Sequence, residues 1–377
     1  MIWEMLMRRA LWVFFLLIIA ASPAGVSGGA KKMALDPRAS LIDVAARRVE
    51  LQHTKSAHVE SALKQMEGCS KLAPVDAPAG PMNIPHHYLN GSHGPTNPAE
   101  AEATRVYSQF AKRVTEGMNQ FLATGDHTEA ACAQAQIDQW AMAKALLDYD
   151  AQESSQSWYQ VEWTLCTVAI SESVLLNDPA LEAQVTARDV AWMNKVAHRM
   201  LSFPKAAQEK NNHHYWKGLA AISTGVISGD EELFGFGVQA YFDGVNEIDK
   251  RGALPLEMAR HERAIQYQSF AVEPLIAIAE FAERQHIPLY SYQSPTGHTI
   301  GDAIEFLGQA VADPSIVKAY ATENQDVNTS GPEFYASLEF YTRRFPGRPL
   351  PATIVEGLNR PQFATRLGGS TTLLAGN

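Results

Sequence analysis

Two short stretches of this sequence gather residue types that can transfer protons and bind anions. The first, KNNHHYWKGLAAIST at residues 210–224, sets asparagines, histidines, a tyrosine and a tryptophan before an apolar helix pattern. The second, LEMARHERAIQYQSF at 256–270, carries Arg260, Arg263 and Tyr267 at spacings of three and four, which predicts one stripe of a helix. Two guanidiniums beside a phenol favour its phenolate, because a nearby cation stabilises the ionised form. Tyr267 is therefore a candidate base.

The first stretch also has a purely structural explanation. Asn211 or Asn212 can cap a helix by accepting a backbone N–H of its first turn. His213, Trp216 and Lys217 then share one face of that helix, at spacings of three and four residues. On its own, this stretch is typical of a capped helix that begins with histidines.

The second stretch has a structural explanation as well. Glu257, Arg260 and Glu262 can form a solvated, ion-paired helix face, while Tyr267 packs in the core. The functional interpretation gains weight only because both stretches occur in one chain.

Helices must position these residues. Apolar side chains recur every four positions from Val106 to Leu122, and Thr128 can cap the next helix. Similar patterns predict helices over 157–176, 182–202, 212–228, 232–248, 257–285, 300–312 and 332–344. No stretch shows the alternation of a strand, so we expect essentially no sheet. A bundle, a solenoid and a closed toroid remain, and no repeat of fixed period supports a solenoid. The helix count fits an all-α, incomplete α/α toroid of antiparallel helices best.

Size and charge exclude some classes of function. The chain has 377 residues and a net charge of −10, and 46% of its residues are hydrophobic and 19% charged. This length and this hydrophobic content are ample for a large core. No basic block interleaved with aromatic residues appears, so we expect no nucleic-acid partner. We divide the chain into an N-terminal lead at 31–68, a main helical domain at 69–370 and a tail at 371–377, after a targeting segment at 1–30.

The targeting segment has the layout of a secretory signal peptide. Arg8 and Arg9 precede an apolar run from 10 to 21, and small residues follow. The run is shorter than the roughly 20 residues of a membrane span, so we expect cleavage and no stable membrane insertion. A retained N-terminal anchor is the alternative. The mature protein is then periplasmic or secreted.

Export changes the interpretation of the three cysteines, because an oxidising compartment favours disulfides. Cys69 lies in a stretch with glycine and proline, and Cys132 lies in a helix pattern. Apolar residues surround Cys166 in WTLCTVAI. We pair Cys69 with Cys132 and expect Cys166 to be a buried free thiol.

The two stretches together resemble a known family. NNHHYW at 211–216 resembles the NNHxYW signature of polysaccharide lyase family 5, the alginate lyases that act on poly-β-D-mannuronate. LPLEMARHERAIQY at 254–267 is similar to the second signature of that family. Shorter matches follow the same order: ACAQAQIDQWAMAKALL (131–147), ENQDV (323–327), EFYASLEFY (333–341) and TRLGG (365–369). The similarity extends from about Cys69 to Gly369.

The resemblance implies a fold, a reaction and residue roles. The family folds as an incomplete α/α toroid with a deep cleft and carries a disulfide at positions matching Cys69 and Cys132. Its lyases remove the C5 proton of a uronate and expel the oxygen at C4, without a metal or cofactor. By resemblance, Asn212, Arg260 and His213 neutralise the sugar carboxylate, and Tyr267 is both base and acid. Residues expected to contact the anionic polysaccharide are Tyr88 in a lid at 84–98, Trp140, Tyr215, Trp216, Lys217 and Arg263.

Some features depart from the family or leave alternatives open. His214 and Met142 stand where the family has a smaller residue and an arginine, and the acidic net charge is unexpected for a polyanion-degrading enzyme. A polyglucuronate lyase and a non-catalytic polyuronate-binding protein are alternatives. A third is an α/α-barrel glycoside hydrolase, whose carboxylates would come from Asp138, Glu162, Glu257 and Glu262. His86, His87 and His93 invite a zinc site, but no HExxH or paired CxxC accompanies them. We expect a monomer.

Overall fold

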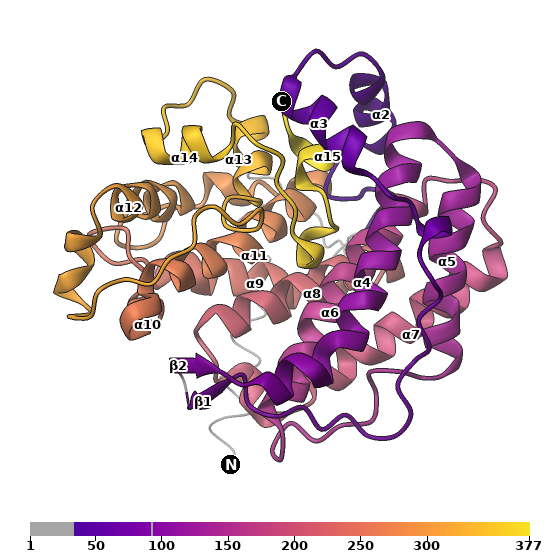
Figure 1. Cartoon of the computed structure of the whole chain (residues 1–377), viewed down its shortest axis with the longest axis horizontal. Coiled ribbons are helices and arrows are strands. Elements are labelled where there is room, and N and C mark those ends of the chain that lie inside the picture. Colours follow the sequence, from indigo (N-terminus) through magenta and orange to yellow (C-terminus); the bar gives the residue numbers. More distant parts are fainter. Residues whose placement is uncertain (1–33, 92) are drawn as a thin grey trace, which may run out of the picture. The chain divides into compact units, whose positions relative to one another are not determined.

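Helices make up most of the described residues (Figure 1). The computed structural model describes residues 34–91 and 93–377, so the predicted signal peptide lies outside the described residues. Residues 35–377 form one compact unit. Among the described residues, no helix combines the length and apolar character needed to cross a membrane.

The helices differ widely in length. The long helices are α4 (Pro98–Thr124), α5 (His127–Met142), α6 (Ser155–Leu175), α7 (Ala183–Leu201), α8 (Asn212–Ser228), α9 (Glu231–Asn246), α11 (Ala264–Arg284) and α12 (Ile300–Ala312). The shorter α-helices are α2 (Val44–Gln52), α3 (Ala57–Gln65), α10 (Pro255–Met258), α13 (Leu338–Arg344), α14 (Ala352–Gly357) and α15 (Thr371–Ala375). Short 3₁₀ helices are η1 (Cys69–Lys71), η2 (Pro204–Ala207), η3 (His261–Arg263), η4 (Leu289–Ser291), η5 (Pro314–Ala319) and η6 (Thr365–Leu367).

Helix α8 lies in the interior and packs against α6, α7, α9 and α11. Its contact with α9 is close because glycines face each other there. A Cβ atom at Gly218 would lie 2.5 Å from that of Ala240, and one at Gly237 would lie 2.5 Å from that of Ile222. Nearly every residue of α8 is consequently buried, including the polar ones at its start.

Most predicted helices are present, and the differences have local causes. Helices 212–228 and 300–312 match the prediction residue for residue. The predicted cap at Thr128 is wrong, since the Asp126 carboxylate caps α5 and accepts the Thr128 N–H at 2.8 Å. A small antiparallel hairpin of β1 (Tyr88–Asn90) and β2 (His93–Thr96) lies in the segment expected to be loop. Only 338–344 of the predicted helix 332–344 is α-helical.

The predicted helix over 257–285 is broken, and the break affects the candidate site. Helix α10 ends at Met258, and α11 begins only at Ala264. Between them His261 has a φ of 53°, a left-handed conformation that an α-helix cannot contain. Arg260 and Arg263 therefore precede α11, and the prediction that they share one helical stripe with Tyr267 is wrong.

The two ends of the described chain are joined by a buried arginine. Arg47 of α2 donates from Nε to the Leu373 carbonyl at 2.7 Å and from Nη2 to the Thr372 and Gly376 carbonyls. Because three carbonyls accept from one guanidinium, the last residues are held in place. Residues 371–375, which we expected in a tail, form the buried helix α15. Helix η6, just before them, packs against α6 and α4.

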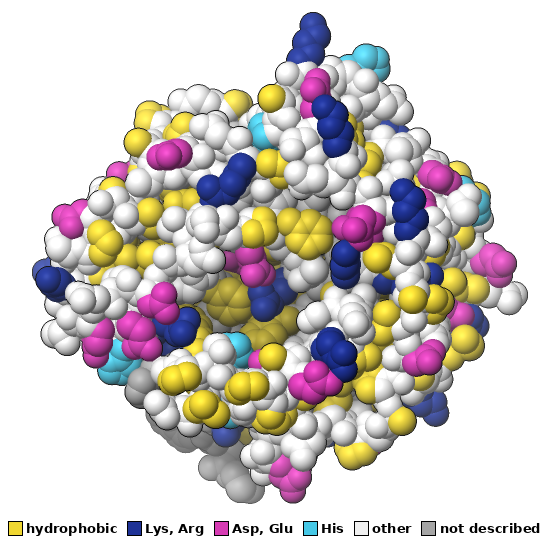
Figure 2. All heavy atoms as spheres, viewed as in Figure 1, with side chains coloured by type: hydrophobic (Ala, Val, Ile, Leu, Met, Phe, Trp, Pro, Cys, Tyr) yellow, Lys and Arg dark blue, Asp and Glu magenta, His cyan; other side chains and the backbone are white. Residues whose placement is uncertain are grey.

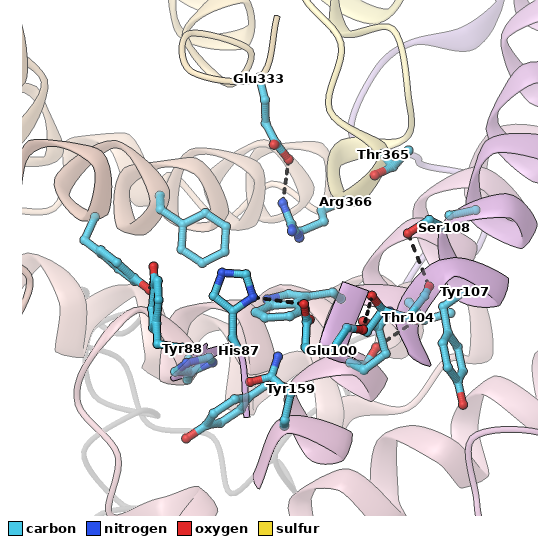
Figure 3. A pocket seen from close by; sticks show the side chains of 18 of the residues that line it. His87, Tyr88, Glu100, Thr104, Tyr107, Ser108, Tyr159, Glu333, Thr365 and Arg366 are labelled. Atoms are coloured by element: carbon cyan, nitrogen blue, oxygen red, sulfur yellow. Dashed lines mark hydrogen bonds and ion pairs between the residues drawn. The ribbon is translucent and has the colours of Figure 1, made fainter. Parts of the chain in front are cut away.

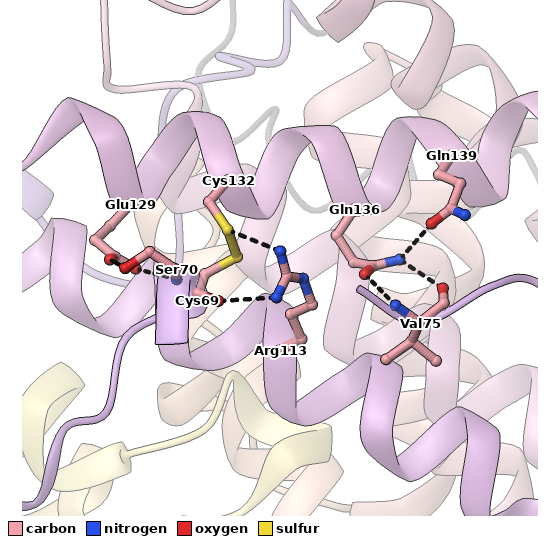
Figure 4. The surroundings of a disulfide bond; sticks show 8 residues. All are labelled: Cys69, Ser70, Val75, Arg113, Glu129, Cys132, Gln136 and Gln139. Carbon is pink, nitrogen blue, oxygen red and sulfur yellow. Dashed lines mark hydrogen bonds between the residues drawn. A yellow bond between two sulfur atoms is a disulfide. The ribbon is translucent and has the colours of Figure 1, made fainter. Parts of the chain in front are cut away.

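The disulfide between Cys69 and Cys132 is present, with a Cα–Cα distance of 5.9 Å, and Cys166 is a buried free thiol, as predicted (Figure 4). Arg113 of α4 donates to the Cys69 carbonyl at 2.9 Å. Gln136 of α5 accepts the Val75 N–H and donates to its carbonyl, both at 2.9 Å. These bonds fasten the start of the segment leading to the hairpin onto α4 and α5.

Glu172 is a carboxyl that burial holds in its neutral form. It lies in the middle of α6 and is fully buried. Neither of its carboxyl oxygens has a hydrogen-bond partner among the residues that the structure describes. Burial without a partner disfavours the charge and raises the pKa of Glu172 from 4.5 to about 8.

We expect Glu172→Gln to stabilise the protein at alkaline pH. The folded chain holds a proton that the unfolded chain loses above pH 4.5, so wild-type stability falls as pH rises from 4.5 to about 8. Glutamine cannot ionise, and the variant should exceed wild type at about pH 9 by roughly 1 kcal/mol or more, with little difference at about pH 5. Urea unfolding at both pH values measures this. The same difference at both pH values would contradict it.

Candidate active site

A cavity of about 610 Å³ opens on one face of the helical unit (Figure 2). Apolar and basic side chains gather in the hollow of that face. The walls come from the hairpin segment, α4, α6, the start of α8, the turn before α11, α11 itself and η6. The lining residues that bear on chemistry are His87, Tyr88, Glu100, Tyr159, Trp163, Asn211, His213, Arg260, Arg263, Tyr267, Phe270, Glu333 and Arg366.

Tyr267, in the first turn of α11, meets Arg260 and Tyr88 at this cavity. The Arg260 Cζ lies 3.7 Å from the centroid of the Tyr267 ring. The Tyr88 hydroxyl lies 3.1 Å from the Tyr267 hydroxyl. Burial raises the pKa of the Tyr267 phenol above its usual range, and Arg260 opposes that rise only in part. The neutral phenol of Tyr267, and not the expected phenolate, is therefore favoured. Arg260 lies over the ring, and burial removes water from the hydroxyl.

The hairpin segment is held against the same turn. The Arg263 Cζ lies 5.1 Å from the centroid of the Tyr88 ring, a cation–π contact. The Gly94 N–H donates to a carboxylate oxygen of Glu262 at 3.2 Å. In this structure, Tyr88 thus lies directly beside Tyr267.

His213 lines the cavity, and the Nδ1 edge of its ring contacts a buried carboxyl group. Its Nδ1 lies 2.6 Å from Glu162 Oε1, and its ring stacks on Tyr159 with centroids 3.5 Å apart. Burial, then Lys217 and further cations lower the pKa of His213 well below its usual value. The imidazole is therefore neutral.

Arg366, in the TRLGG stretch, adds a cation to which the sequence analysis gave no role. Its Cζ lies 4.9 Å from the Trp163 ring centroid and 5.1 Å from that of Phe270. Its Nη1 is 2.5 Å from Glu333 Oε1 (Figure 3). An arginine on an aromatic floor, beside a carboxylate, is a suitable contact for an anionic ligand.

Comparison with known proteins gives the chain a family. The sequence model of the family described as Alginate lyase matches residues 43–317. A polysaccharide lyase of Stenotrophomonas maltophilia (strain K279a) is 32% identical over 281 residues, covering 73% of this chain and 80% of the relative. This chain belongs to the alginate lyase family. An alginate lyase of Pseudomonas fluorescens (strain SBW25) is 29% identical over 282 residues, 72% of each chain.

Solved structures of this family confirm the predicted fold. A histidine-to-alanine variant of alginate lyase A1-III, complexed with a tetrasaccharide, is 38% identical with a TM-score of 0.85 and covers 92% of this chain and 97% of its own. The structure of alginate lyase A1-III from Sphingomonas species A1 has a TM-score of 0.83 and is 37% identical. The match covers 93% of this chain and 99% of that one. The all-α, incomplete α/α toroid and the resemblance to polysaccharide lyase family 5 are thus confirmed.

Of the two asparagines in the family's first motif, Asn211 is the cap and Asn212 lies behind the cavity. Asn212 is fully buried, and its backbone N–H and side-chain amide donate to the Glu257 carboxylate at 2.6 and 2.9 Å. Asn211 accepts the His213 N–H as the cap of α8 and also lines the cavity. Burial raises the pKa of Glu257 to about 7, while Asn212 and Arg260 oppose the rise. Asn212 therefore acts behind the cavity, through Glu257.

Four residues predicted to contact the polysaccharide do not line the cavity, and for them that prediction is wrong. Trp140, Tyr215, Trp216 and Lys217 are all buried in the interior. Trp140 stacks on Phe110 with ring centroids 3.7 Å apart and donates its indole N–H to the Val75 carbonyl at 2.8 Å. The other three are enclosed because α8 is covered on every side.

Tyr88 and Arg263 do line the cavity, as do Tyr159, Trp163, Phe270 and Arg366, which the sequence analysis missed. The four-residue spacing of Tyr159 and Trp163 on α6 was an available signal. Its weakness is that most of α6 is buried, so its aromatic residues do not mark a single exposed face. His214, unassigned from sequence, bonds Asp243 Oδ2 at 2.9 Å and is structural.

The glycoside hydrolase alternative needs a carboxylate pair at the cavity. None of the four proposed carboxylates, Asp138, Glu162, Glu257 and Glu262, lines it. Glu162 and Glu257 are fully buried behind it, and Asp138 pairs with Arg188 at 2.6 Å. Among the described residues, no group of three or more histidine, cysteine, aspartate and glutamate side chains is placed to hold a metal ion.

We expect Trp140→Phe to destabilise the fold without altering the cavity. The change removes a buried hydrogen bond and part of a stacked ring, which together cost roughly 1–3 kcal/mol. Trp163→Phe, at the cavity wall, should cost less, because the Trp163 indole N–H donates to no partner among the described residues. Urea unfolding of both variants provides the comparison. A larger loss for Trp163→Phe would contradict the assignment.

Proposed function

We propose that this protein cleaves polymannuronate in alginate by β-elimination, leaving 4,5-unsaturated uronate ends. The observation that carries the proposal is the meeting of Tyr267, Arg260 and neutral His213 at one cavity, in a chain of the alginate lyase family. The relatives named above include alginate lyases and a lyase complexed with a tetrasaccharide. The protein acts as a monomer in this proposal.

The first requirement of the reaction is to neutralise the carboxylate beside the C5 proton. That proton is weakly acidic while the carboxylate keeps its charge. Arg260 and His213 supply donors where the enolate-like charge develops, a contribution of about 2.7–4 kcal/mol for each well-placed donor. Asn211 presents its amide at the same wall, and Asn212 supports Arg260 through Glu257.

The second requirement is one group that takes the C5 proton and returns a proton to O4. In mannuronate, both lie on the same face of the sugar ring, so one phenol oxygen in reach of both is sufficient. Tyr267 fills this role, and Arg260 opposes in part the rise that burial causes in the pKa of its phenol. The segment 84–98 covers the substrate as a lid, with Tyr88 closing beside Tyr267.

The cavity supports an anionic polysaccharide as partner despite the acidic net charge. Arg260, Arg263 and Arg366 all line it, and local potential in a cleft can override the net charge of a chain. Trp163 and Phe270 offer apolar rings to sugar faces. These replace the buried tryptophans as expected sugar contacts.

We expect Tyr267→Phe to lower kcat at least about 100-fold while the protein still binds substrate, because general acid–base catalysis contributes about 10²–10⁴-fold. The readout is the ultraviolet absorbance of the unsaturated product. Tyr241→Phe is the control, since the Tyr241 hydroxyl is buried and finds no partner among the described residues. Wild-type turnover in Tyr267→Phe would exclude the acid–base role.

Products from block-defined polymers test the substrate. We expect unsaturated products from polymannuronate, and much less from polyguluronate or polyglucuronate. Preference for polyglucuronate would replace the proposed substrate but keep the reaction. Reducing ends without ultraviolet absorbance would indicate hydrolysis, and binding without product would indicate a non-catalytic protein.

Export is part of the proposal, because residues 1–30 have the layout of a secretory signal peptide. We propose that the signal peptide at 1–30 is removed and that the mature enzyme is periplasmic or secreted. Mass spectrometry of the protein from fractionated cells would identify the new N-terminus. A full-length chain in the cytoplasm would contradict export.

A further inference from the structure

Lys217 is a buried charge that the proposed mechanism does not use. Its side chain has no exposed surface, and its ammonium lies 4.0 Å from the centroid of the Trp158 ring. Its ammonium group contacts the carboxyl groups of Glu162 and Glu209. Burial of such a network costs free energy, and apolar side chains of similar size stabilise a fold at least as well. Stability alone therefore does not explain the burial of Lys217, whereas the orientation of a neighbouring side chain would.

The two carboxyl oxygens of Glu162 contact different side chains. Oε1 lies 2.6 Å from His213 Nδ1, and Oε2 lies 3.3 Å from Lys217 Nζ. His213 and Lys217 are four residues apart on α8, so both reach the same carboxyl group on α6. Because Nδ1 is turned to buried Glu162, Nε2 is the nitrogen left for the cavity.

This arrangement decides where a proton on Glu162 must be. An ammonium group has three donors and no acceptor, so Oε2 beside Lys217 can only accept. A protonated Glu162 therefore carries its proton on Oε1 and donates it to His213 Nδ1. The neutral imidazole then has its own proton on Nε2, facing the cavity.

We propose that Glu162, oriented by Lys217, is a positioning residue that holds neutral His213 in the tautomer whose Nε2–H donates to the substrate carboxylate. The identity of that carboxylate rests on the proposed function, whereas the tautomer itself does not. Ionised Glu162 would reverse the arrangement. Nδ1 would then carry the proton, and the Nε2 lone pair would face the anionic sugar.

The surrounding charges place this reversal in the alkaline range. Burial raises the pKa of Glu162 to about 8, with Lys217 and then Arg366 opposing the rise. Lys217, Arg260 and Arg366 also disfavour a charged His213, against the opposite effect of Glu209. Within the described part of the chain, Tyr149, Tyr159 and Cys166 also interact with Glu162, and burial raises the pKa of each, so they stay neutral.

The variant Glu162→Gln tests whether Glu162 acts by donating a proton to His213 Nδ1 or by carrying a negative charge. Lys217 can only donate, so it binds the amide oxygen and turns the amide NH₂ toward His213 Nδ1. The variant thus imitates protonated Glu162 at every pH. We expect KM of wild type for polymannuronate to rise about tenfold per pH unit above about pH 8, and KM of the variant to stay level, with kcat little changed by the substitution.

Glu172→Gln is the matched control. Glu172 is a buried glutamate of the same helix with a similarly raised pKa, and it does not contact His213. Its substitution should leave the wild-type rise of KM in place. The proposal is overturned if Glu162→Gln keeps the alkaline rise of KM, or if it loses activity throughout the pH range while circular dichroism shows a native fold.

A measurement on the ligand-free protein tests the tautomer without activity. In ¹⁵N-histidine NMR, the His213 signals are those missing from a His213→Ala sample. We expect the Nε2–H tautomer at about pH 7, a change to Nδ1–H above about pH 8, and no change in Glu162→Gln. An Nδ1–H or doubly protonated His213 at about pH 7 in wild type would overturn the proposal. A wild-type protein without lyase products but with the expected tautomer would overturn only the proposed function.

Discussion

The polar side chains at the start of α8 are largely shielded from water and therefore form hydrogen bonds with other side chains. The site depends on which neighbouring helix supplies each of these hydrogen-bond partners. Helix α8 is covered by four other helices, so unpaired polar groups would cost roughly 1–3 kcal/mol each. Asn212 bonds Glu257 before the turn at Arg260, and His214 bonds Asp243 of α9. His213 lies between them and is the one that also reaches the cavity. Consecutive residues of a helix point about 100° apart, which is why three neighbours serve three different elements.

The break between α10 and α11 is the second determinant of the site. A continuous helix would keep Arg260 a full two turns from Tyr267, since seven residues rise about 10 Å. The left-handed residue His261 and the short turn that follows fold Arg260 back over the Tyr267 ring instead. The same turn binds the hairpin through Glu262 and Arg263. One irregular turn thus brings the cation, the phenol and the covering segment together.

The sequence allows much of this fold to be predicted, but less of the site. Apolar periodicity predicts α8 and α12 to the residue, because both are capped helices with clear turns around them. The pairing of Cys69 with Cys132 was also correct. Periodicity could not show which polar neighbour faces the cavity, so Asn212 was favoured over Asn211. It could not reveal Arg366 either, since η6 reaches the cavity by packing against α6 and α4, which are far from it in the sequence.

Carboxylates accompany the cations at the cavity, and their exposure explains how an anionic substrate can still bind. Arg366 pairs with Glu333, and Arg263 lies 3.7 Å from Asp326. The side chains of Glu333 and Asp326 are 45% and 69% exposed, so water can solvate them when they leave. Exposed ion pairs contribute only about 0–1 kcal/mol. A uronate carboxylate can replace them at little cost, whereas the pair of Glu162 and Lys217 is fully buried and cannot be exchanged. The buried contact between Lys217 and Glu162 therefore orients His213, and the exposed ion pairs are available to the substrate.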